Sequence, residues 1–197
     1  PDGASVRWVR DPSAQVEPIL AMAQDQGFLG GAPLQDHIDN GLAFASVIGE
    51  RPRDLCVDLG SGGGVPALVV AMAVPELPVV CVDRGARRCA FLREAAQRLG
   101  IADRMSVLES DAETASRRPD LQASAGWVTA RSFGPPAVTA EAACRYLRSS
   151  GELLVSEPPG GATGQRWASA PLEMLGLAFV EVVRRDGTAL ARCRRTD

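Results

Sequence analysis

The stretch 55–66, which reads LCVDLGSGGGVP, constrains the fold of this chain more than any other part of the sequence. Its short apolar run is typical of a buried parallel strand, and the glycines after it are typical of a strand-to-helix turn. Gly60, Gly62 and Gly64 allow positive φ angles and leave room for a ligand close to the backbone. Pro66 suits the start of a helix, where its missing N–H is not needed. The stretch therefore predicts a strand, turn and helix whose free amides face a ligand.

A second unit of the same kind follows. Residues 78–82 (PVVCV) form an apolar run that ends at Asp83, about twenty residues after the glycines. An acid at this distance is placed to accept hydrogen bonds from both hydroxyl groups of a cofactor ribose. The segment 62–67 also fits the G-x-G-x-x-A pattern of dinucleotide sites, and an ordinary turn with a capping aspartate has a similar sequence. The order of strand, turn, helix, strand and acid favours a ribose-containing cofactor.

The length of the chain and one acid bear on which cofactor this is. A nicotinamide enzyme usually adds a catalytic domain to its nucleotide-binding half, and 197 residues leave no room for one. Asp58, just before the glycines, suits a cationic group better than a pyrophosphate. S-adenosylmethionine has a ribose, an adenine and a cationic sulfonium, and it carries no phosphate. We therefore predict an S-adenosylmethionine site whose residues in these two units are Asp58, Gly60, Ser61, Gly62, Gly64, Asp83 and Arg84.

The rest of the chain continues the alternation of strands and helices. Helices are expected at 14–26 and 34–48, and strands at 54–59, 78–83, 104–108, 126–131 and 151–156. The segments 177–183 and 188–193 read as a terminal hairpin around the turn at 185–187. An open parallel sheet closed by an antiparallel hairpin is the Rossmann-like α/β fold of class I methyltransferases. We expect a single domain over 1–197, with 1–50 as an N-terminal helical extension.

Several stretches also carry a family resemblance. They read VDLGSGGGVPALVVA, VDRGARRCAFLREAAQRLGI, DAE and TARSFGP. Together they resemble the glucose-inhibited division protein B family, the guanine-N7 methyltransferases of small-subunit ribosomal RNA. The resemblance extends from about residue 36 to 155; in its first part, 36–48, His37 and Asp39 match while Asn40 and Gly41 depart. It implies the class I fold, S-adenosylmethionine as cofactor, and ribosomal RNA or the small-subunit particle as partner.

The resemblance also implies roles for single residues. Gly60, Gly62, Gly64 and Asp83 match cofactor-binding positions, and Ala112 and Glu113 match the loop that flanks the adenine. Arg131 matches the arginine after the fourth strand and is the predicted catalytic residue. Arg87 stands where the family has a basic residue, and we predict from the residues themselves that Arg88 and Glu157 join Arg87 and Arg131 in binding the substrate. Two positions reverse the charge expected from the family: Asp111, in the cofactor loop, replaces an arginine, and Glu157 stands near an expected lysine.

Charge leaves the substrate open. The net charge is −3, so the chain as a whole does not have the basic character of a nucleic-acid-binding protein. Arg84, Arg87 and Arg88 nevertheless crowd one helix start at the ligand-binding edge, where they either bind phosphates or form a solvated face. We expect a second cluster to protect an exposed edge of the hairpin: Arg184, Arg185, Arg192, Arg194 and Arg195.

The numbers and spacing of cysteine and histidine argue against a zinc site and a catalytic triad. Five cysteines without C-x-x-C spacing suggest buried, reduced thiols in a cytoplasmic protein, and one histidine leaves little to build a zinc site or a Ser-His-Asp triad. No apolar stretch is long enough to span a membrane.

Guanine N7 carries a lone pair and no proton, so its methylation requires no general base. We expect His37 to have a structural or loop-positioning role between the N-terminal helices and the sheet; a role as catalytic base is the alternative. Trp127 is expected in the core, and Trp8 and Trp167 in a lid or at the surface.

Three functions remain open on the sequence. The first is methylation of guanine N7 in ribosomal RNA. The second is methylation of a small molecule on the same scaffold, which Asp111, Glu157 and the acidic total favour. The third is a non-catalytic module that has kept the cofactor pocket, and Arg131 argues against it.

Overall fold

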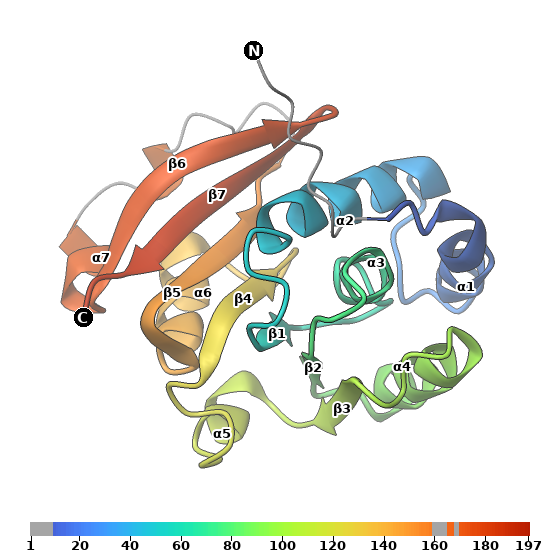
Figure 1. Cartoon of the computed structure of the whole chain (residues 1–197), viewed down its shortest axis with the longest axis horizontal. Coiled ribbons are helices and arrows are strands. Elements are labelled where there is room, and N and C mark those ends of the chain that lie inside the picture. The colour runs from blue at the N-terminus through green and yellow to red at the C-terminus, as the bar shows by residue number, and fades with distance from the viewer. Residues whose placement is uncertain (1–9, 159–164, 168–169) are drawn as a thin grey trace.

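A seven-stranded sheet forms the centre of the computed structural model, which describes residues 10–158, 165–167 and 170–197 (Figure 1). The strand order is β3-β2-β1-β4-β5-β7-β6; the first five strands in this order are parallel, and β7 pairs antiparallel with both β5 and β6. The strands are β1 (Cys56–Leu59), β2 (Val79–Asp83), β3 (Met105–Glu109), β4 (Ala125–Ala130), β5 (Leu147–Ser156), β6 (Leu177–Arg185) and β7 (Thr188–Arg195). This is the predicted open parallel sheet with a terminal hairpin, and the expected strands are confirmed.

Helices cover both faces of the sheet (Figure 1). One face packs against the helices α2 (Leu34–Ile48), α3 (Ala67–Ala73) and α4 (Ala86–Arg98), and α1 (Ser13–Asp25) packs on α2 and α3. The other face packs against α5 (Ala112–Ser116), α6 (Pro136–Cys144) and α7 (Ala170–Met174). A short 3-10 helix, η1, spans Gln165–Trp167. Strands β1 and β4 are buried along their whole length. Their side chains are therefore apolar except for Asp58 and Thr129.

The N-terminal segment packs closely on α3 and on the glycine turn. Gly41 of α2 lies so near α3 that an added Cβ would stand 2.4 Å from the Cβ of Val69. At Gly63 an added Cβ would stand 2.8 Å from the carbonyl oxygen of Phe28, in the loop between α1 and α2. The departure at Gly41 thus permits close helix packing, and Gly63 lets that loop lie against the glycine turn.

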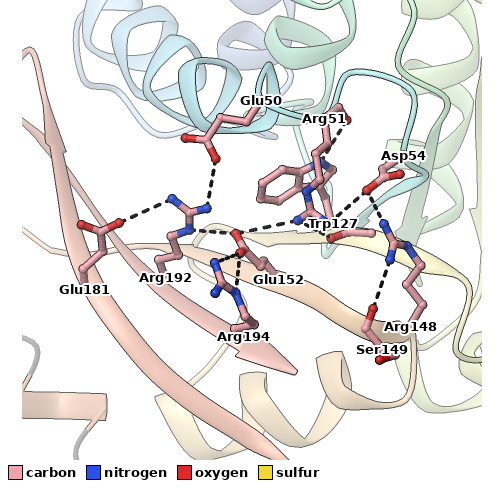
Figure 2. A network of polar contacts seen from close by, with 11 residues as sticks. Glu50, Arg51, Asp54, Trp127, Arg148, Ser149, Glu152, Glu181, Arg192 and Arg194 are labelled. Atoms are coloured by element: carbon pink, nitrogen blue, oxygen red, sulfur yellow. Dashed lines mark hydrogen bonds and ion pairs between the residues drawn. The ribbon is translucent and has the colours of Figure 1, made fainter. Parts of the chain in front are cut away.

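A cluster of charged side chains lies where the parallel strands begin (Figure 2). Glu152 of β5 is 2% exposed and binds Arg192 and Arg194 of β7 at 2.7 Å each. Since β6 forms the edge of the sheet and β7 lies inside it, the expectation of an exposed protective edge is wrong for these two arginines. They face a buried carboxylate instead.

The aromatic and cysteine predictions have mixed outcomes. Trp127 is fully buried, as expected, and four cysteines are buried free thiols: Cys56, Cys81, Cys89 and Cys193. Trp167 is 2% exposed, so its assignment to the surface is wrong. Trp8 lies outside the described residues. No helix in the described ranges is long and apolar enough to cross a membrane.

Candidate active site

The glycine turn and Asp83 meet where β1 and β2 end. Gly60 and Gly62 adopt φ angles of +68° and +50°, conformations that side chains other than glycine rarely adopt. The amide of Gly62 donates to Oδ2 of Asp83 at 2.9 Å, and the amide of Gly85 donates to Oδ1 at 2.8 Å. Arg88 adds Nε and Nη2 contacts to Oδ1 at 3.0 and 2.9 Å. Burial favours a higher pKa for Asp83, but these donors outweigh it and hold the pKa below its ordinary value.

Asp58, at the end of β1, has a different environment. It is 1% exposed, and its Oδ1 accepts a hydrogen bond from the Thr129 hydroxyl at 2.7 Å. Its Oδ2 is buried and has no hydrogen-bond partner among the described residues. Burial raises the pKa of Asp58 to about 6, although the hydroxyl groups of Thr129 and Ser61 work against the shift. The end of β1, next to the turn, therefore has a buried carboxylate oxygen that accepts no hydrogen bond from the described residues.

A cavity of about 630 Å³ lies above this turn. Most of the predicted cofactor residues line it: Gly60, Ser61, Gly62, Asp83, Arg84, Asp111 and Ala112. Asp58, Gly64 and Glu113 are absent from the lining. Asp58 is buried at the end of β1, Gly64 packs on Leu68, and Glu113 pairs with Arg117 at the surface. Asp111 caps α5 by accepting from the Thr114 amide at 2.8 Å.

Sequence reasoning missed one side of this cavity. The loop between α1 and α2 closes it with four residues, and Phe133 and Val138 close it from the β4 side. The four loop residues are Gly27, Phe28, Leu29 and Gly30. Their only signal in the sequence was a glycine-rich break between two helices.

A second cavity of about 710 Å³ adjoins the first. Arg131 and Ser132, which follow β4, line both cavities. The second cavity is otherwise lined by α2, the end of β5, η1 and the β6–β7 turn, with acidic and basic side chains mixed. Its acids are Asp36, Asp39, Glu157 and Asp186, and its arginines besides Arg131 are Arg166 and Arg184. A group transferred between the two cavities would pass Arg131.

The carboxylate of Glu157 is buried and binds two side chains of η1. Its side chain is fully buried, and Oε1 accepts a hydrogen bond from Nε1 of Trp167 at 2.6 Å. Oε2 lies 3.4 Å from Nη1 of Arg166. The acid that replaces an expected lysine therefore holds η1 against the end of β5 at the wall of the second cavity.

The arginines of the α4 start lie around the first cavity. Arg84 lines it, Arg88 binds Asp83, and the guanidinium of Arg87 lies 5.5 Å from the ring centroid of Phe28. Phosphate contact by Arg87 and Arg88 stays a prediction, since no contact in the structure tests it. Both residues contact the cofactor side of the site in the structure.

The residues of the first cavity fit S-adenosylmethionine. Asp83 presents a carboxylate for a ribose. Asp58 does not line the cavity, but its orphaned Oδ2 lies at the end of β1, next to the glycine turn, where a negative charge favours a cationic ligand. The apolar side chains of Leu29, Val65 and Phe133 suit an adenine ring. No group of three or more potential metal ligands occurs in the part of the chain that the structure describes.

Comparison with known proteins identifies the family. The family model described as rRNA small subunit methyltransferase G matches residues 32–158. The chain belongs to this family. Proteins named ribosomal RNA small subunit methyltransferase G include one from a Roseiflexus species, 32% identical over 83% of this chain and 67% of its own length. One from Acidothermus cellulolyticus is 34% identical over 71% of this chain and 60% of its own length.

Other relatives extend well beyond this chain. The Prochlorococcus marinus proteins of the methyltransferase G family share 28 to 30% identity with it, and the matched part spans 59% and 48% of two of them. The chain thus spans about half to three-fifths of the length of these curated relatives.

Solved structures show the same fold. An RNA methyltransferase from Salinibacter ruber, in complex with S-adenosyl-L-homocysteine, has a TM-score of 0.58 at 18% identity and covers 84% of this chain and 94% of its own. A putative S-adenosyl-L-methionine-dependent methyltransferase from Methanococcus maripaludis has a TM-score of 0.64 at 14% identity, over 97% and 95% of the two chains. The chain therefore has the class I methyltransferase fold that its sequence predicts.

Proposed function

We propose that this chain transfers a methyl group from S-adenosylmethionine to N7 of a guanine in small-subunit ribosomal RNA. The observation that carries the proposal is the pair of cavities joined at Arg131 and Ser132. The first cavity has the acceptors that the cofactor requires, and the second is large enough for a nucleobase. Membership of the methyltransferase G family supports the reaction and the substrate.

The chain's own residues supply binding and alignment. When bound, the cofactor would supply an electrophilic methyl group: guanine N7 would form a bond to the methyl carbon as the carbon–sulfur bond breaks in line, S-adenosylhomocysteine would leave, and no base is needed. Asp83 holds the ribose and the glycine turn lets the cofactor approach the backbone. Arg131 orients the acceptor at the junction, the place where the two cavities meet. The only histidine is engaged by two partners, so the site contains no free imidazole for proton abstraction.

Transfer of a labelled methyl group tests this function. The protein is incubated with methyl-labelled cofactor and, in parallel, with small ribosomal subunits, free ribosomal RNA and a metabolite extract. We expect label in RNA, as 7-methylguanine after digestion. Label in another base contradicts the N7 assignment.

A small-molecule acceptor is the second candidate, because four acids line the second cavity. Label in the metabolite fraction alone supports that function. Binding of the cofactor without transfer to any fraction indicates a non-catalytic module. The salt dependence of the rate separates the first two candidates, since phosphate contacts make RNA binding fall steeply with salt.

A further inference from the structure

The single histidine of the chain connects the two sides of the site. His37 lies on α2 and is 2% exposed. Its Nε2 lies 2.9 Å from the carbonyl oxygen of Gly30, a residue of the cofactor cavity wall. Its Nδ1 lies 2.6 Å from Nη2 of Arg131, which lines both cavities. One imidazole thus spans from the α1–α2 loop to the junction.

The two partners determine the tautomer of the ring. A backbone carbonyl only accepts hydrogen bonds, so Nε2 must carry a proton and donate to Gly30. A guanidinium only donates, so Nδ1 must present its lone pair to Arg131. His37 is therefore neutral in this arrangement, and protonation at Nδ1 would place two donors and two positive charges face to face.

We propose that His37 is a positioning residue, which holds the Arg131 guanidinium at the junction of the cavities and links its place to the α1–α2 loop. The catalytic meaning of this link rests on the proposed function, whereas its geometry does not. The hydrogen bond that Arg131 donates to Nδ1 restricts the orientation of its guanidinium. An in-line methyl transfer requires such a fixed orientation of the groups around the acceptor.

The loop side of the link is well anchored. Nε2 of Gln24, on α1, donates to the carbonyl oxygens of Gly30 and Ala32 at 2.6 Å each. Gly30 therefore receives hydrogen bonds from both N-terminal helices while it lines the cofactor cavity. A ligand that fills the cavity contacts this loop, and any shift of Gly30 reaches the imidazole directly.

Charged groups on three elements face the link. Arg131 approaches from the end of β4, Asp36 lies beside His37 on α2, and Asp58 of β1 faces Arg131. Burial lowers the pKa of His37, and the Arg131 charge lowers it further against the opposing effects of Gly30 and Asp36. These shifts agree with the neutral ring that the hydrogen bonds require.

Nuclear magnetic resonance of the imidazole tests the geometry, because one histidine gives one set of ring signals in a protein without a histidine tag. We expect the Nε2–H tautomer and a His37 pKa below 6.5, the ordinary value. In Arg131→Ala the pKa of His37 should rise, because the adjacent positive charge is gone. The Nδ1–H tautomer, or an unchanged pKa in Arg131→Ala, would overturn the proposal.

Addition of S-adenosylhomocysteine tests the link to the loop. We expect the ring signals of His37 to shift as the ligand saturates the protein. Ring signals that stay in place while calorimetry shows binding would contradict the link. If calorimetry shows no binding to the parent protein at all, the proposed function fails, and the tautomer and Arg131→Ala measurements still decide the geometry.

Two conservative variants separate the two hydrogen bonds of the ring. In His37→Asn the amide lies near the former Nδ1 position and can keep Arg131; in His37→Gln it lies near the former Nε2 position and can keep Gly30. We expect His37→Asn to retain about ten-fold more turnover than His37→Gln, a difference of about 1.4 kcal/mol. The KM for the cofactor should be similar in both. Equal turnover, or more in His37→Gln, would show that the contact with Arg131 has no positioning role.

Discussion

Two buried carboxylates, Glu152 and Asp58, lie toward opposite ends of the parallel strands and have opposite environments. Where the strands begin, both oxygens of Glu152 bind arginines at 2.7 Å, as Figure 2 shows. Toward their other end, Oδ2 of Asp58 is buried without a hydrogen-bond partner in the described structure, and so is the amide oxygen of Asn40 on α2. The first arrangement satisfies the charge within the protein, and the second leaves acceptors for a ligand.

The pKa values follow this difference. Burial acts to raise the pKa of both acids, but Arg192 and Arg194 overcome it at Glu152, whose pKa lies below its ordinary value. At Asp58 burial prevails and the pKa rises to about 6. Burial alone therefore does not set the charge of an acid in this protein, because the number of nearby donors decides the sign of the shift.

Arg131→Ala should have the largest effect at the carboxyl end. We expect turnover to fall about 1,000-fold, or about 4 kcal/mol, because a preorganised donor at the junction is lost. Cofactor affinity, measured by calorimetry, should change little. An equal loss of cofactor affinity and turnover would place Arg131 in the cofactor site instead.

Glu152→Gln should have the largest effect at the amino end. Removal of one charge leaves Arg192, whose side chain is 12% exposed, without its buried partner, and we expect a loss of about 3 kcal/mol in unfolding free energy. Denaturant unfolding measures it. Because the pKa of Glu152 is lowered, its contribution in the parent is present above its ordinary pKa of 4.5 and is lost as pH falls through the folded value.

Glu181→Gln is the matched control for that variant. Glu181 also contacts Arg192, at 3.4 Å, but its side chain is 51% exposed. We expect a change below about 0.5 kcal/mol. If Glu181→Gln and Glu152→Gln destabilise equally, burial of the carboxylate does not explain the role of the cluster.

Asp83→Ala should weaken S-adenosylmethionine binding by about 2 kcal/mol through the loss of charge-assisted hydrogen bonds to the ribose. Calorimetry with the cofactor and with S-adenosylhomocysteine measures this loss. Unchanged affinity would refute the ribose assignment.

Asp58→Asn should stabilise the protein at high pH. A raised pKa in the folded state means that ionisation of Asp58 disfavours folding, and this cost grows as pH rises from its ordinary value of 3.8 to beyond 6. We expect a gain of about 1 kcal/mol at pH 8, after the penalty of an unpaired amide donor, and no gain at pH 4. A gain that is independent of pH would contradict the assigned pKa.

Arg88→Ala should have the smallest effect. Arg88 occupies Oδ1 of Asp83, so we expect its removal to strengthen cofactor binding about three-fold, or about 0.6 kcal/mol. Arg93→Ala is the control with unchanged cofactor affinity, since Arg93 lies on the same helix and is not among the residues that line the cavity. A flattened salt dependence of RNA methylation in Arg88→Ala, with cofactor affinity unchanged, would instead support the phosphate contact predicted from sequence.

Sequence patterns predicted the helices, strands and turns of this fold well because each pattern depends on residues that are neighbours in the chain. The glycine turn, the acid that ends β2 and the hairpin turn at 185–187 depend on backbone conformation and on short apolar runs. Their positions in the sheet followed from the usual order of such units. The arginines of β7 were misjudged because charge alone does not reveal whether a strand lies at an edge.

By itself, the sequence determined the alternation of strands and helices, the cofactor turn and the family. Only the tertiary structure decided which distant side chains meet. His37 and Arg131 are 94 positions apart, and Glu157 and Trp167 come together across a segment without a local pattern. The physical reason is that hydrogen-bond partners and burial, which set the tautomer of His37 and the pKa of Asp58, arise from packing between elements and leave no periodic trace in the chain.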